Sequence, residues 1–508
     1  MAEGSAAQSS RAPLRTQLQR AVAFHQRGRL LEAERLYEAI LEVHPQHFDA
    51  LHLLGVIAAQ THRPERALLL IEKAISLNAA SALSHYNRGL ALKALGRFEE
   101  ALASYGRAAE LDSRFATAWF ERGFALTELG EPRTALASYD RAIAIKNDYA
   151  EAHYNRALLL RILGQFDAAL DGFDRAIAAR PGYARAYTSR GTTRLLCGDL
   201  EGGWKDFEWR WRDETHTKEW RRFPQPQWSG QEPLSGRSIL LHGEQGLGDT
   251  LHFCRYARLV AERGATVVLE VPAPLVRLLA TLEGVAQVVA RGTPLPECDY
   301  HCSLMSLPFA FKTTLSTIPA RIPYLRSDAA KLRQWRARLG ESTKLKVGLV
   351  WAGGFRPDQP ECWAENLRRN IPLKKLAALR HPDIEFYGLQ KGQPAESELT
   401  ALAPGWDGPS INDLAPFLID FADTAAVLEN LDLLISVDTA TAHLAGALGR
   451  RVWILNRYDN CWRWLLDRSD SPWYPTARLY RQEAAGDWDG VVRNVRDDLF
   501  RLSVPARA

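Results

Sequence analysis

An acidic side chain ends a glycine-rich turn near the middle of the chain. The turn GEQGLGD, residues 243–249, follows the apolar strand SILLH and precedes a predicted helix. Glycines at the carboxyl end of a strand let a ligand approach the backbone, and we expect Gly246 and Gly248 to serve in this way. Asp249, at the mouth of such a site, is a candidate general base for a hydroxyl nucleophile. The structural alternative, that Asp249 caps the following helix, is compatible with that role.

The order of the glycines in this turn excludes two common nucleotide motifs. No Gly-Lys-Ser/Thr follows, as a P-loop requires, and the pattern is G-x-x-G-x-G instead of the dinucleotide-binding G-x-G-x-x-G. Glu270 lies near the end of the next strand, ATVVLEV, where an acid that binds ribose would stand. An NAD site is therefore kept as a minor alternative.

A second polar segment, SVDTATAH, ends another predicted strand. We expect Asp438 and Thr439 to cap a helix that begins at Ala440 and ends near Leu448. The free N–H groups and the dipole of a helix start favour a phosphate group, and His443, one turn in, reaches the same anion. The alternative is that His443, as a single histidine in a helix, only fills a surface or core position. Because His443 follows an Asp-Thr cap at the end of a strand, we favour the interpretation that it contacts the anion.

The elements that position these residues belong to an α/β fold. From Ser238 the chain reads as strand, turn, helix and strand, the start of a parallel doubly wound sheet. A second start occurs at LKVGLVWAGG, with IEFYGLQ, LDLLISVD and RRVWILN as later strands. We therefore predict two Rossmann-type lobes, residues 237–335 and residues 345–505.

The N-terminal part is a repeat array with a period of 34 residues. Alanine recurs at positions 33, 67, 101, 135 and 169, and glycine at positions 28, 96, 130, 164 and 198. Small residues in register let two antiparallel helices approach closely. Blocks such as NRGLALKALGRFEEALASYGRAAELD resemble the tetratricopeptide repeat. Six such repeats, an α-helical solenoid, fit residues 13–212, and the last of them departs from the consensus.

Stacked repeats form a superhelix with a concave groove, usually for an extended peptide or a partner protein. Two columns are expected on the first helices of the repeats. Asn87 and Asn155 match a column at which asparagine clamps the acceptor backbone in protein O-GlcNAc transferases, which this array resembles. Arg88, Arg122 and Arg156 form the next column and suggest an electropositive groove for an acidic partner. We favour the alternative that these arginines pair with acids on adjacent helices.

Two segments are dense in tryptophan. Residues 204–228 hold five, followed by the Pro/Gly-rich stretch FPQPQWSGQEPLSG, and we assign residues 213–236 to a linker. This cluster either stacks on sugar or, as we favour, covers the apolar end of the last repeat. In the tail, one interpretation is that Trp462 or Trp464 stacks on a base or sugar while Arg463 contacts phosphate. The other is that the segment locks domains together through buried aromatic side chains and Arg–Asp pairs. We favour the second interpretation.

Composition sets the outer limits. The chain has 508 residues, enough for about 3 domains, and its net charge of +4 comes from 64 basic and 60 acidic residues. This balance argues against a dedicated nucleic-acid binder. The polar N-terminus predicts no secretory signal, and the apolar runs are too short for a membrane span. Six scattered cysteines are typical of a reducing cytoplasm, where we expect the protein.

Cysteine and histidine spacing predicts no metal site. The segment Cys298-Asp-Tyr-His301-Cys302 comes nearest to one, but its spacing fits no standard zinc pair and no second pair follows. No acidic D-x-D cluster stands beside the two polar segments. We therefore expect no metal and no cofactor other than a nucleotide-sugar bound as a substrate.

The two polar segments together resemble a family. SVDTATAHLAGALG is similar to the D-T-G-x-x-H-x-A-x-A-L-G signature of bacterial heptosyltransferases, which have the GT-B fold, and GEQGLGDTL resembles their N-lobe turn. The resemblance implies that Asp249 activates the acceptor hydroxyl. It also implies that Asp438, Thr439, Ala440 and His443 contact the donor, although Ala440 stands where the family usually has glycine.

The resemblance extends to cations near the phosphates. Gly353 in the turn WAGG, followed by RRNIP, is similar to the segment that places a basic residue on the diphosphate, which here is Arg368 or Arg369. Lys391, after the strand IEFYGLQ, is a further cation at the same strand ends. The order of repeats, tryptophan-rich hinge and two lobes is also similar to protein O-GlcNAc transferases and flagellin glycosyltransferases.

The sequence therefore predicts an enzyme, an inverting and metal-independent glycosyltransferase. It would move a sugar from a nucleotide-sugar to a hydroxyl of a protein or peptide held by the repeats. Two alternatives remain open. The chain is an interaction scaffold with a degenerate transferase-like region, or it transfers sugar to lipopolysaccharide or another glycan.

Overall fold

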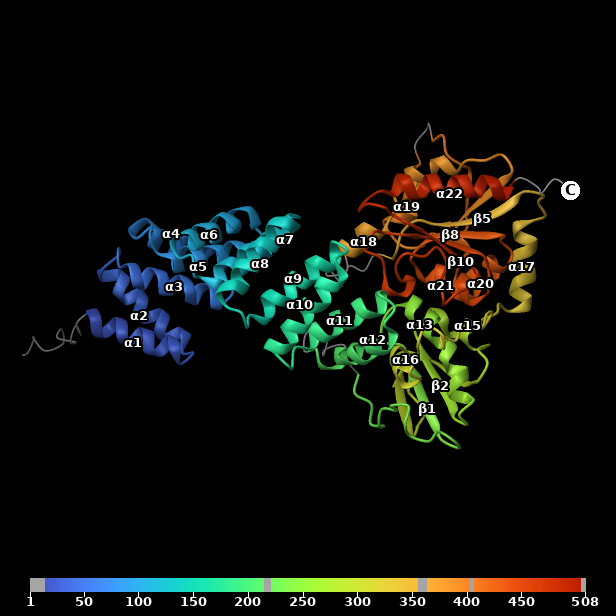
Figure 1. Ribbon diagram of the computed structural model, residues 1–508, viewed down its shortest axis with the longest axis horizontal. Coiled ribbons are helices and arrows are strands. Elements are labelled where there is room, and N and C mark those ends of the chain that lie inside the picture. Colours follow the sequence, from blue (N-terminus) through green and yellow to red (C-terminus); the bar gives the residue numbers. More distant parts are fainter. Residues whose placement is uncertain (1–13, 214–220, 355–362, 403–405, 504–508) are drawn as a thin grey trace, which may run out of the picture. The chain divides into compact units, whose positions relative to one another are not determined.

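A computed structural model describes residues 14–213, 221–354, 363–402 and 406–503 (Figure 1). The chain forms two compact units, Met1–Ala186 and Tyr187–Ala508, and each is considered on its own. None of the helices in the described ranges is both long and apolar enough to cross a membrane.

Helices alone make up the described part of the first unit. Consecutive helices pack on each other as pairs, as tetratricopeptide repeats require. They are α1 (Leu14–Gln26), α2 (Leu30–Val43), α3 (Phe48–Gln60), α4 (Pro64–Leu77), α5 (Ala82–Ala94), α6 (Phe98–Leu111), α7 (Ala116–Glu128), α8 (Pro132–Ile145), α9 (Ala150–Ile162) and α10 (Phe166–Ala179). The boundary between the units falls within α11 (Ala184–Leu196), so most of the last predicted repeat belongs to the second unit.

Two kinds of glycine explain why this sequence forms helix pairs. Gly96 and Gly130 follow helix ends with φ of +71° and +77°, a left-handed conformation that favours glycine and stops the helix. Gly89 lies against the ring of Tyr105 on the paired helix, where a Cβ atom would overlap that ring. Tyr105 is fully buried. The close approach of small residues predicted from the 34-residue period is therefore confirmed.

The second unit begins with the end of the repeat array and continues into a parallel sheet. The strands lie in the order β3-β2-β1-β4. The elements up to the second sheet are α12 (Leu200–Phe207), η1 (Glu208–Arg212), β1 (Ser238–His242), α13 (Leu247–Phe253), η3 (Cys254–Tyr256), α14 (Ala257–Ala261), β2 (Thr266–Val271), η4 (Ala273–Leu275), α15 (Val276–Leu279), β3 (Val285–Ala290), β4 (Tyr300–Ser303), η5 (Leu304–Ser306), α16 (Leu307–Ala310) and α17 (Ala329–Leu339).

A second parallel sheet follows, with strand order β10-β9-β8-β5-β6-β7. Its elements are β5 (Leu345–Val350), α18 (Trp363–Arg369), η7 (Leu373–Leu379), β6 (Ile384–Gly388), α19 (Ala395–Thr400), β7 (Ile411–Asp413), η8 (Ala415–Phe417), α20 (Phe421–Glu429), β8 (Leu433–Val437), α21 (Ala440–Ala447), β9 (Val452–Asn456), η9 (Trp462–Trp464), β10 (Ala477–Arg481) and α22 (Trp488–Ser503). Counted from β5 as the first strand, the order is 6-5-4-1-2-3, which is that of the Rossmann fold. The strand order reverses between β5 and β8, and ligands bind at this switch point in such sheets. The α/β prediction is confirmed.

One predicted helix is broken. The segment from Thr250 to Gly264 reads as a single amphipathic helix, but the structure divides it into α13, η3 and α14. Arg255 lies at the break with its side chain buried, and its Nε donates to the carbonyl of His252 at 2.8 Å. Its Nη1 donates to the carbonyl of Trp473, 2.8 Å away. The helical pattern holds no information about this distant acceptor.

Candidate functional site

The glycine-rich turn and the predicted helix start meet at the junction of the two sheets, where α13 packs on α21 (Figure 1). Gly248 makes this approach possible. A Cβ atom at Gly248 would lie 3.0 Å from Cδ2 of His443 and 3.4 Å from Cα of Ala440. Three residues from segments almost 200 positions apart, each a predicted site residue, are therefore brought into contact.

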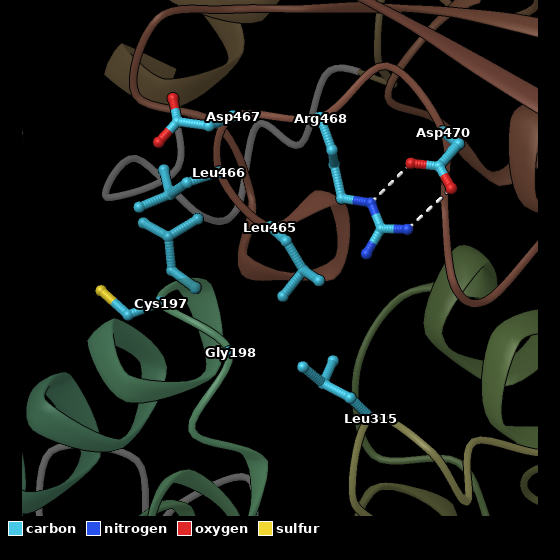
Figure 2. A pocket seen from close by; sticks show the side chains of 9 residues that line it. Cys197, Gly198, Leu315, Leu465, Leu466, Asp467, Arg468 and Asp470 are labelled. Atoms are coloured by element: carbon cyan, nitrogen blue, oxygen red, sulfur yellow. Dashed lines mark hydrogen bonds and ion pairs between the residues drawn. The ribbon is translucent and has the colours of Figure 1, made fainter.

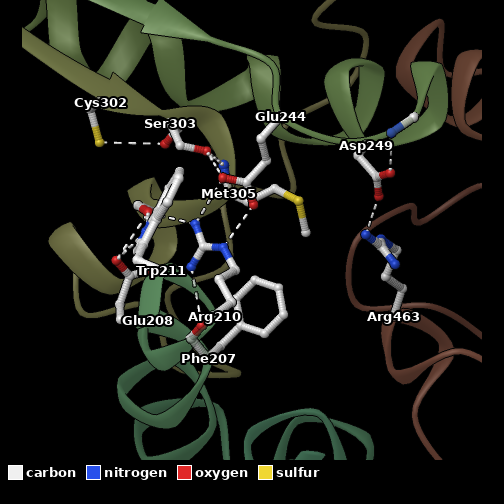
Figure 3. A network of polar contacts seen from close by, with 12 residues as sticks. Phe207, Glu208, Arg210, Trp211, Glu244, Asp249, Cys302, Ser303, Met305 and Arg463 are labelled. Carbon is white, nitrogen blue, oxygen red and sulfur yellow. Dashed lines mark hydrogen bonds and ion pairs between the residues drawn. The ribbon is translucent and has the colours of Figure 1, made fainter. Parts of the chain in front are cut away.

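Asp249 bridges the two sheets through an ion pair. Its Oδ1 accepts a hydrogen bond from Nη2 of Arg463, and its Oδ2 accepts one from the backbone N–H of Gly246 at 3.0 Å (Figure 3). The second contact differs from the cap expected as the structural alternative, because the N-cap of α13 is Gly246 and Asp249, at the third helical position, bonds back to its N–H. Burial lowers the pKa of Arg463, but the charges of Asp249 and Asp438 outweigh it and the net shift is upward. Arg463 therefore places a permanent positive charge beside Asp249.

The tail that carries Arg463 is a buried aromatic segment. Trp464 is fully buried, Trp462 nearly so, and the Arg463 guanidinium lies 4.3 Å from the Trp462 ring centroid. These contacts, with the pair to Asp249, are those that the domain-locking interpretation requires. Trp464 also stacks on His443, with ring centroids 5.3 Å apart.

Arg369 lies at the start of α21. Its Nη1 donates to the carbonyl of Asp438 at 3.1 Å, and its Nη2 donates to Oδ1 of Asn366. The guanidinium rests on Gly353 and leaves no room for a side chain there. Nε of Arg369 and Nδ2 of Asn366 are buried without a partner in the part of the chain that the structure describes. Buried donors rarely lack an acceptor, so each of these two atoms could still donate a hydrogen bond.

The other two predicted cations have different surroundings. Arg368, half exposed, is directed to Asp459, with Nε 3.1 Å from Oδ2. Lys391 donates through Nζ to the carbonyl of Leu418. Of the two arginines left open by the sequence, Arg369 is the one that contacts the helix start.

Thr439 occupies the N-cap position of α21, but its side chain does not cap the helix. Its hydroxyl instead lies 3.0 Å from that of Ser436.

The turn after β5 is held by Gln390, whose Oε1 accepts from the backbone N–H groups of Trp351 at 3.1 Å and Ala352 at 2.9 Å. Gln390 was missed by sequence reasoning, because a glutamine after a strand carries no distinctive pattern.

Two buried histidines and a tyrosine complete the site. The hydroxyl of Tyr474 lies 2.8 Å from Nδ1 of His252 and 3.0 Å from Nδ1 of His443. Burial lowers the pKa of His443 to about 3 and that of His252 well below its ordinary value. His443 is therefore neutral, and its Nε2, 3.6 Å from Oδ1 of Asp438, forms no ion pair. Sequence reasoning missed His252 and Tyr474, which lack any motif.

The turn that carries Asp249 is anchored to the end of the repeat array. Arg210 is buried, and its Nε and Nη2 donate to the two carboxylate oxygens of Glu244 at 2.7 and 3.0 Å (Figure 3). Its Nη1 donates to Glu208 at 2.6 Å, and the Ser303 hydroxyl at the end of β4 donates to Glu244 at 2.5 Å. The network joins η1, the turn and β4 into one connected group.

The tryptophan-rich hinge also packs inward. Trp204 is buried and meets Phe253 and Trp462 edge-on, with centroids 6.1 and 5.1 Å away. Trp209 stacks on Tyr187 of α11 at 3.8 Å. These contacts cover the end of the last repeat, as the favoured interpretation requires. Trp220 lies outside the described residues.

A pocket of about 550 Å³ opens beside this hinge (Figure 2). It lies between the end of α11, a loop that follows α16 and the segment after η9, which bends through left-handed Leu465 and Asp467 with φ of +53° and +48°. Its walls are Leu196, Cys197, Gly198, Leu315, Leu465, Leu466, Asp467, Arg468 and Asp470. Arg468 and Asp470 form an ion pair across its rim.

The predicted groove residues of the first unit have local partners. Arg88 bonds Glu72 and Ser104, Arg156 bonds Asp140 at 2.6 Å, and Arg122 bonds Ser138 at 2.5 Å. Each partner is sixteen residues away, on a neighbouring helix. Arg88 and Arg156 thus pair with acids, as the structural alternative requires, whereas the partner of Arg122 is the uncharged Ser138.

The two asparagines of the groove also have neighbours. Asn87 lies 3.2 Å from Nε2 of the buried His52. Asn155 hydrogen-bonds the hydroxyl of Tyr139, and burial outweighs that bond to raise the pKa of Tyr139 to about 12. Both amides are thus tied to the array itself.

The structure places Glu270, the acid of the alternative NAD site, in the interior, where it is fully buried and pairs with Arg221. Within the described ranges, no three His, Cys, Asp or Glu side chains gather as metal ligands would.

Comparison with known proteins identifies the repeats. Tetratricopeptide-repeat family models match residues 18–82, 89–130, 125–161 and 150–183. The N-terminal part of the chain is therefore a tetratricopeptide-repeat array, a class of fold that presents extended binding surfaces. The sixth predicted repeat is not among these matches.

A curated relative extends further along the chain. Protein FlbA of Caulobacter vibrioides is 27% identical over 332 residues, which cover 60% of this chain and 53% of FlbA. The chain thus spans about half the length of the curated relative it matches. Because 60% of the chain exceeds the repeat array, the similarity includes part of the α/β region.

Solved structures also match part of the chain. The crystal structure of MamA is 24% identical with a TM-score of 0.31, and the match covers 32% of this chain and 96% of MamA. YrrB, described as a TPR protein with an unusual peptide-binding site, is 21% identical with a TM-score of 0.31 over 36% of this chain and 98% of its own. PilF of Pseudomonas aeruginosa is 19% identical with a TM-score of 0.36, and the match covers 39% of this chain and 90% of PilF.

Proposed function

We propose that the Tyr187–Ala508 unit is a glycosyltransferase of the GT-B type that uses a nucleotide-sugar donor. The observation that carries this proposal is the pair of unpartnered buried donors, Nε of Arg369 and Nδ2 of Asn366, beside the start of α21. They lie by the switch point of a Rossmann-ordered sheet, where nucleotides bind in such folds. A diphosphate supplies the missing acceptor oxygens, and the helix start adds its dipole.

Asp249 is the proposed general base. It takes the proton from an acceptor hydroxyl, whose oxygen attacks the anomeric carbon of the donor sugar. The bond from that carbon to the diphosphate breaks, and its electron pair leaves with the nucleoside diphosphate, so the configuration inverts. Arg369 stabilises the negative charge that develops on the leaving group. Arg463 pairs with Oδ1 of Asp249, and each carboxylate oxygen keeps a second lone pair that can accept the proton.

The repeat array supports a protein acceptor, because tetratricopeptide solenoids bind peptides and proteins and a lipid-linked sugar needs no such surface. The acceptor and the donor nucleotide are distinct parts of this proposal. The first concerns Met1–Ala186 and the second concerns Tyr187–Ala508.

Donor binding is the test. We expect one among UDP-, GDP-, dTDP-, CMP- and ADP-sugars to raise the melting temperature of the second unit by a few degrees at saturation. Arg369→Ala should weaken this binding roughly 10- to 100-fold, since a hydrogen bond to a charged group is lost. Arg496→Ala is the matched control, because Arg496 on α22 pairs only with its neighbour Asp497 in the described structure. A donor affinity that is unchanged in Arg369→Ala contradicts the assigned site.

One observation favours a second candidate. Both carboxylate oxygens of Asp249 are engaged, by Arg463 and by the N–H of Gly246, and Ala440 stands where the similar family has glycine. An interaction scaffold with an inactive transferase-like unit would keep these contacts permanently. The absence of a melting shift with every donor would favour the scaffold.

A further inference from the structure

We propose that Tyr474 is a positioning residue that sets the tautomer of His443. Its hydroxyl, held between two histidines, directs the only proton of the His443 imidazole to Nε2, the nitrogen that faces Asp438. The tautomer follows from the positions of the three side chains, while its use in binding a donor rests on the proposed function.

The geometry leaves the three side chains little freedom. Tyr474 and His252 are fully buried, and His443 is 4% exposed. Gly446 on α21 lies against the Tyr474 ring so closely that a side chain there would overlap it. Trp473 packs beside His252 with centroids 4.6 Å apart, and Trp464 stacks on His443. Packing therefore fixes the rings, and only the protons remain to be placed.

The number of protons follows from burial. Burial is the largest cause of the lowered pKa of both imidazoles, and it raises the pKa of the Tyr474 hydroxyl. All three groups are neutral at pH 7. The hydroxyl has one proton and each imidazole has one, which lies on Nδ1 or on Nε2.

The hydroxyl cannot donate to both histidines. It lies 2.8 Å from Nδ1 of His252 and 3.0 Å from Nδ1 of His443, and its other two neighbours, Arg255 and Tyr324, act as donors toward it. The hydroxyl therefore donates to one histidine and accepts from the other. One histidine therefore carries its proton on Nδ1 and the other on Nε2.

The unpartnered nitrogen decides between them. Nε2 of His252 is buried without a partner in the described structure. An orphaned buried N–H is rarer in proteins than an under-satisfied acceptor, so this nitrogen is bare and His252 carries its proton on Nδ1. His252 then donates to Tyr474, Tyr474 donates to His443, and the His443 proton lies on Nε2.

This order has a chemical consequence. Nε2 of His443 lies 3.6 Å from Oδ1 of Asp438, at the helix start. There it offers a neutral N–H donor. The hydrogen bonds from His252 to Tyr474 and from Tyr474 to His443 polarise the imidazole and make this donor stronger. A phosphate or sugar oxygen is the class of ligand that accepts such a bond, whereas the reverse tautomer would present a lone pair that repels it.

The test reads the tautomer directly. In the full chain labelled with ¹⁵N-histidine, nitrogen–proton correlation spectra separate protonated from bare ring nitrogens, and His252→Gln and His443→Gln assign the two signals. We expect the proton on Nδ1 of His252 and on Nε2 of His443. A proton on Nδ1 of His443 would overturn the proposal.

Two variants extend the test. In Tyr474→Phe we expect His443 to become a mixture of tautomers and the affinity for inorganic pyrophosphate to fall about tenfold. In Tyr256→Phe, which removes another buried hydroxyl, one bonded to Thr313, neither should change. If His443 keeps its proton wholly on Nε2 in Tyr474→Phe, Tyr474 does not set it.

Pyrophosphate also separates the two proposals. If it fails to bind while the assigned tautomers are found, the proposed function is contradicted and the role of Tyr474 in setting the tautomer stands. If it binds while His443 is protonated on Nδ1, the role of Tyr474 in setting the tautomer is contradicted and the proposed function stands.

Discussion

Arginine has different surroundings in the two units. In the repeat array Arg88, Arg122 and Arg156 recur in one column, and each bonds a side chain sixteen residues away. In the second unit Arg210 and Arg463 are buried and reach partners far apart in the sequence, Glu244 and Asp249. The array uses the same local contact repeatedly, whereas the α/β unit uses each arginine once to join distant segments.

The difference separates structure from candidate chemistry. A partly exposed pair within one repeat adds little stability, because water already solvates both charges. A buried arginine needs an opposite charge beside it, since desolvation of a lone charge is very costly. Buried arginines therefore mark the junctions on which the second unit depends, and the candidate site is at one of them.

The largest expected effect tests whether that junction performs chemistry. Asp249→Asn should lower the rate of donor hydrolysis or sugar transfer about 1,000-fold with donor affinity little changed, as for loss of a general base. The rate is measured by chromatography of the released nucleotide. Glu262→Gln, at the C-cap of α14 and paired with Arg258, is the control and should keep full activity. Full activity in Asp249→Asn would remove Asp249 as the base.

A stability measurement probes the buried network. Arg210→Met should lower the free energy of unfolding of the second unit by about 4 kcal/mol, because it leaves two glutamates unpaired. All tryptophans except Trp119 lie in this unit, so urea denaturation followed by their fluorescence reports on it. Adding Glu244→Gln should restore part of the loss. A loss below about 1 kcal/mol would show that the network is not a buried junction.

Acid should weaken the second unit through its neutral histidines. Burial lowers the pKa of His242 and of His443 to about 3 from an ordinary value of 6.5. The unfolded chain therefore binds more protons below pH 6.5, and stability is lost as the pH falls towards 3. At pH 5 each histidine should cost about 2 kcal/mol. Equal urea midpoints at pH 7 and pH 5 would contradict the burial of these rings in neutral form.

The smallest effect belongs to the array. Arg156→Ala should change the stability of the first unit by about 0.5 kcal/mol or less, because its pair with Asp140 is largely exposed. Far-UV circular dichroism during urea denaturation measures it. A loss of more than about 2 kcal/mol would mean that the column is not equivalent to a set of surface pairs.

The same contrast explains what the sequence could predict. The array is periodic, so its paired helices and the close approach of their small residues could be predicted from spacing alone. The strands and the two polar segments of the second unit were also predictable, because apolar runs and helix starts are local patterns. Asn366, Gln390 and Tyr474 were not, since each acts through one partner that only the fold brings near. The broken helix at Arg255 has the same cause.

Hydrogen exchange at the start of α21 tests the central claim most directly. Amides of residues 440–443 are measured by mass spectrometry with and without each nucleotide-sugar. We predict that one donor slows exchange in this segment and around Arg369 in the wild-type chain but not in Arg369→Ala. If no donor slows exchange there, or if the only protection lies at the pocket beside Leu315, the second unit is not a glycosyltransferase with its donor site at α21.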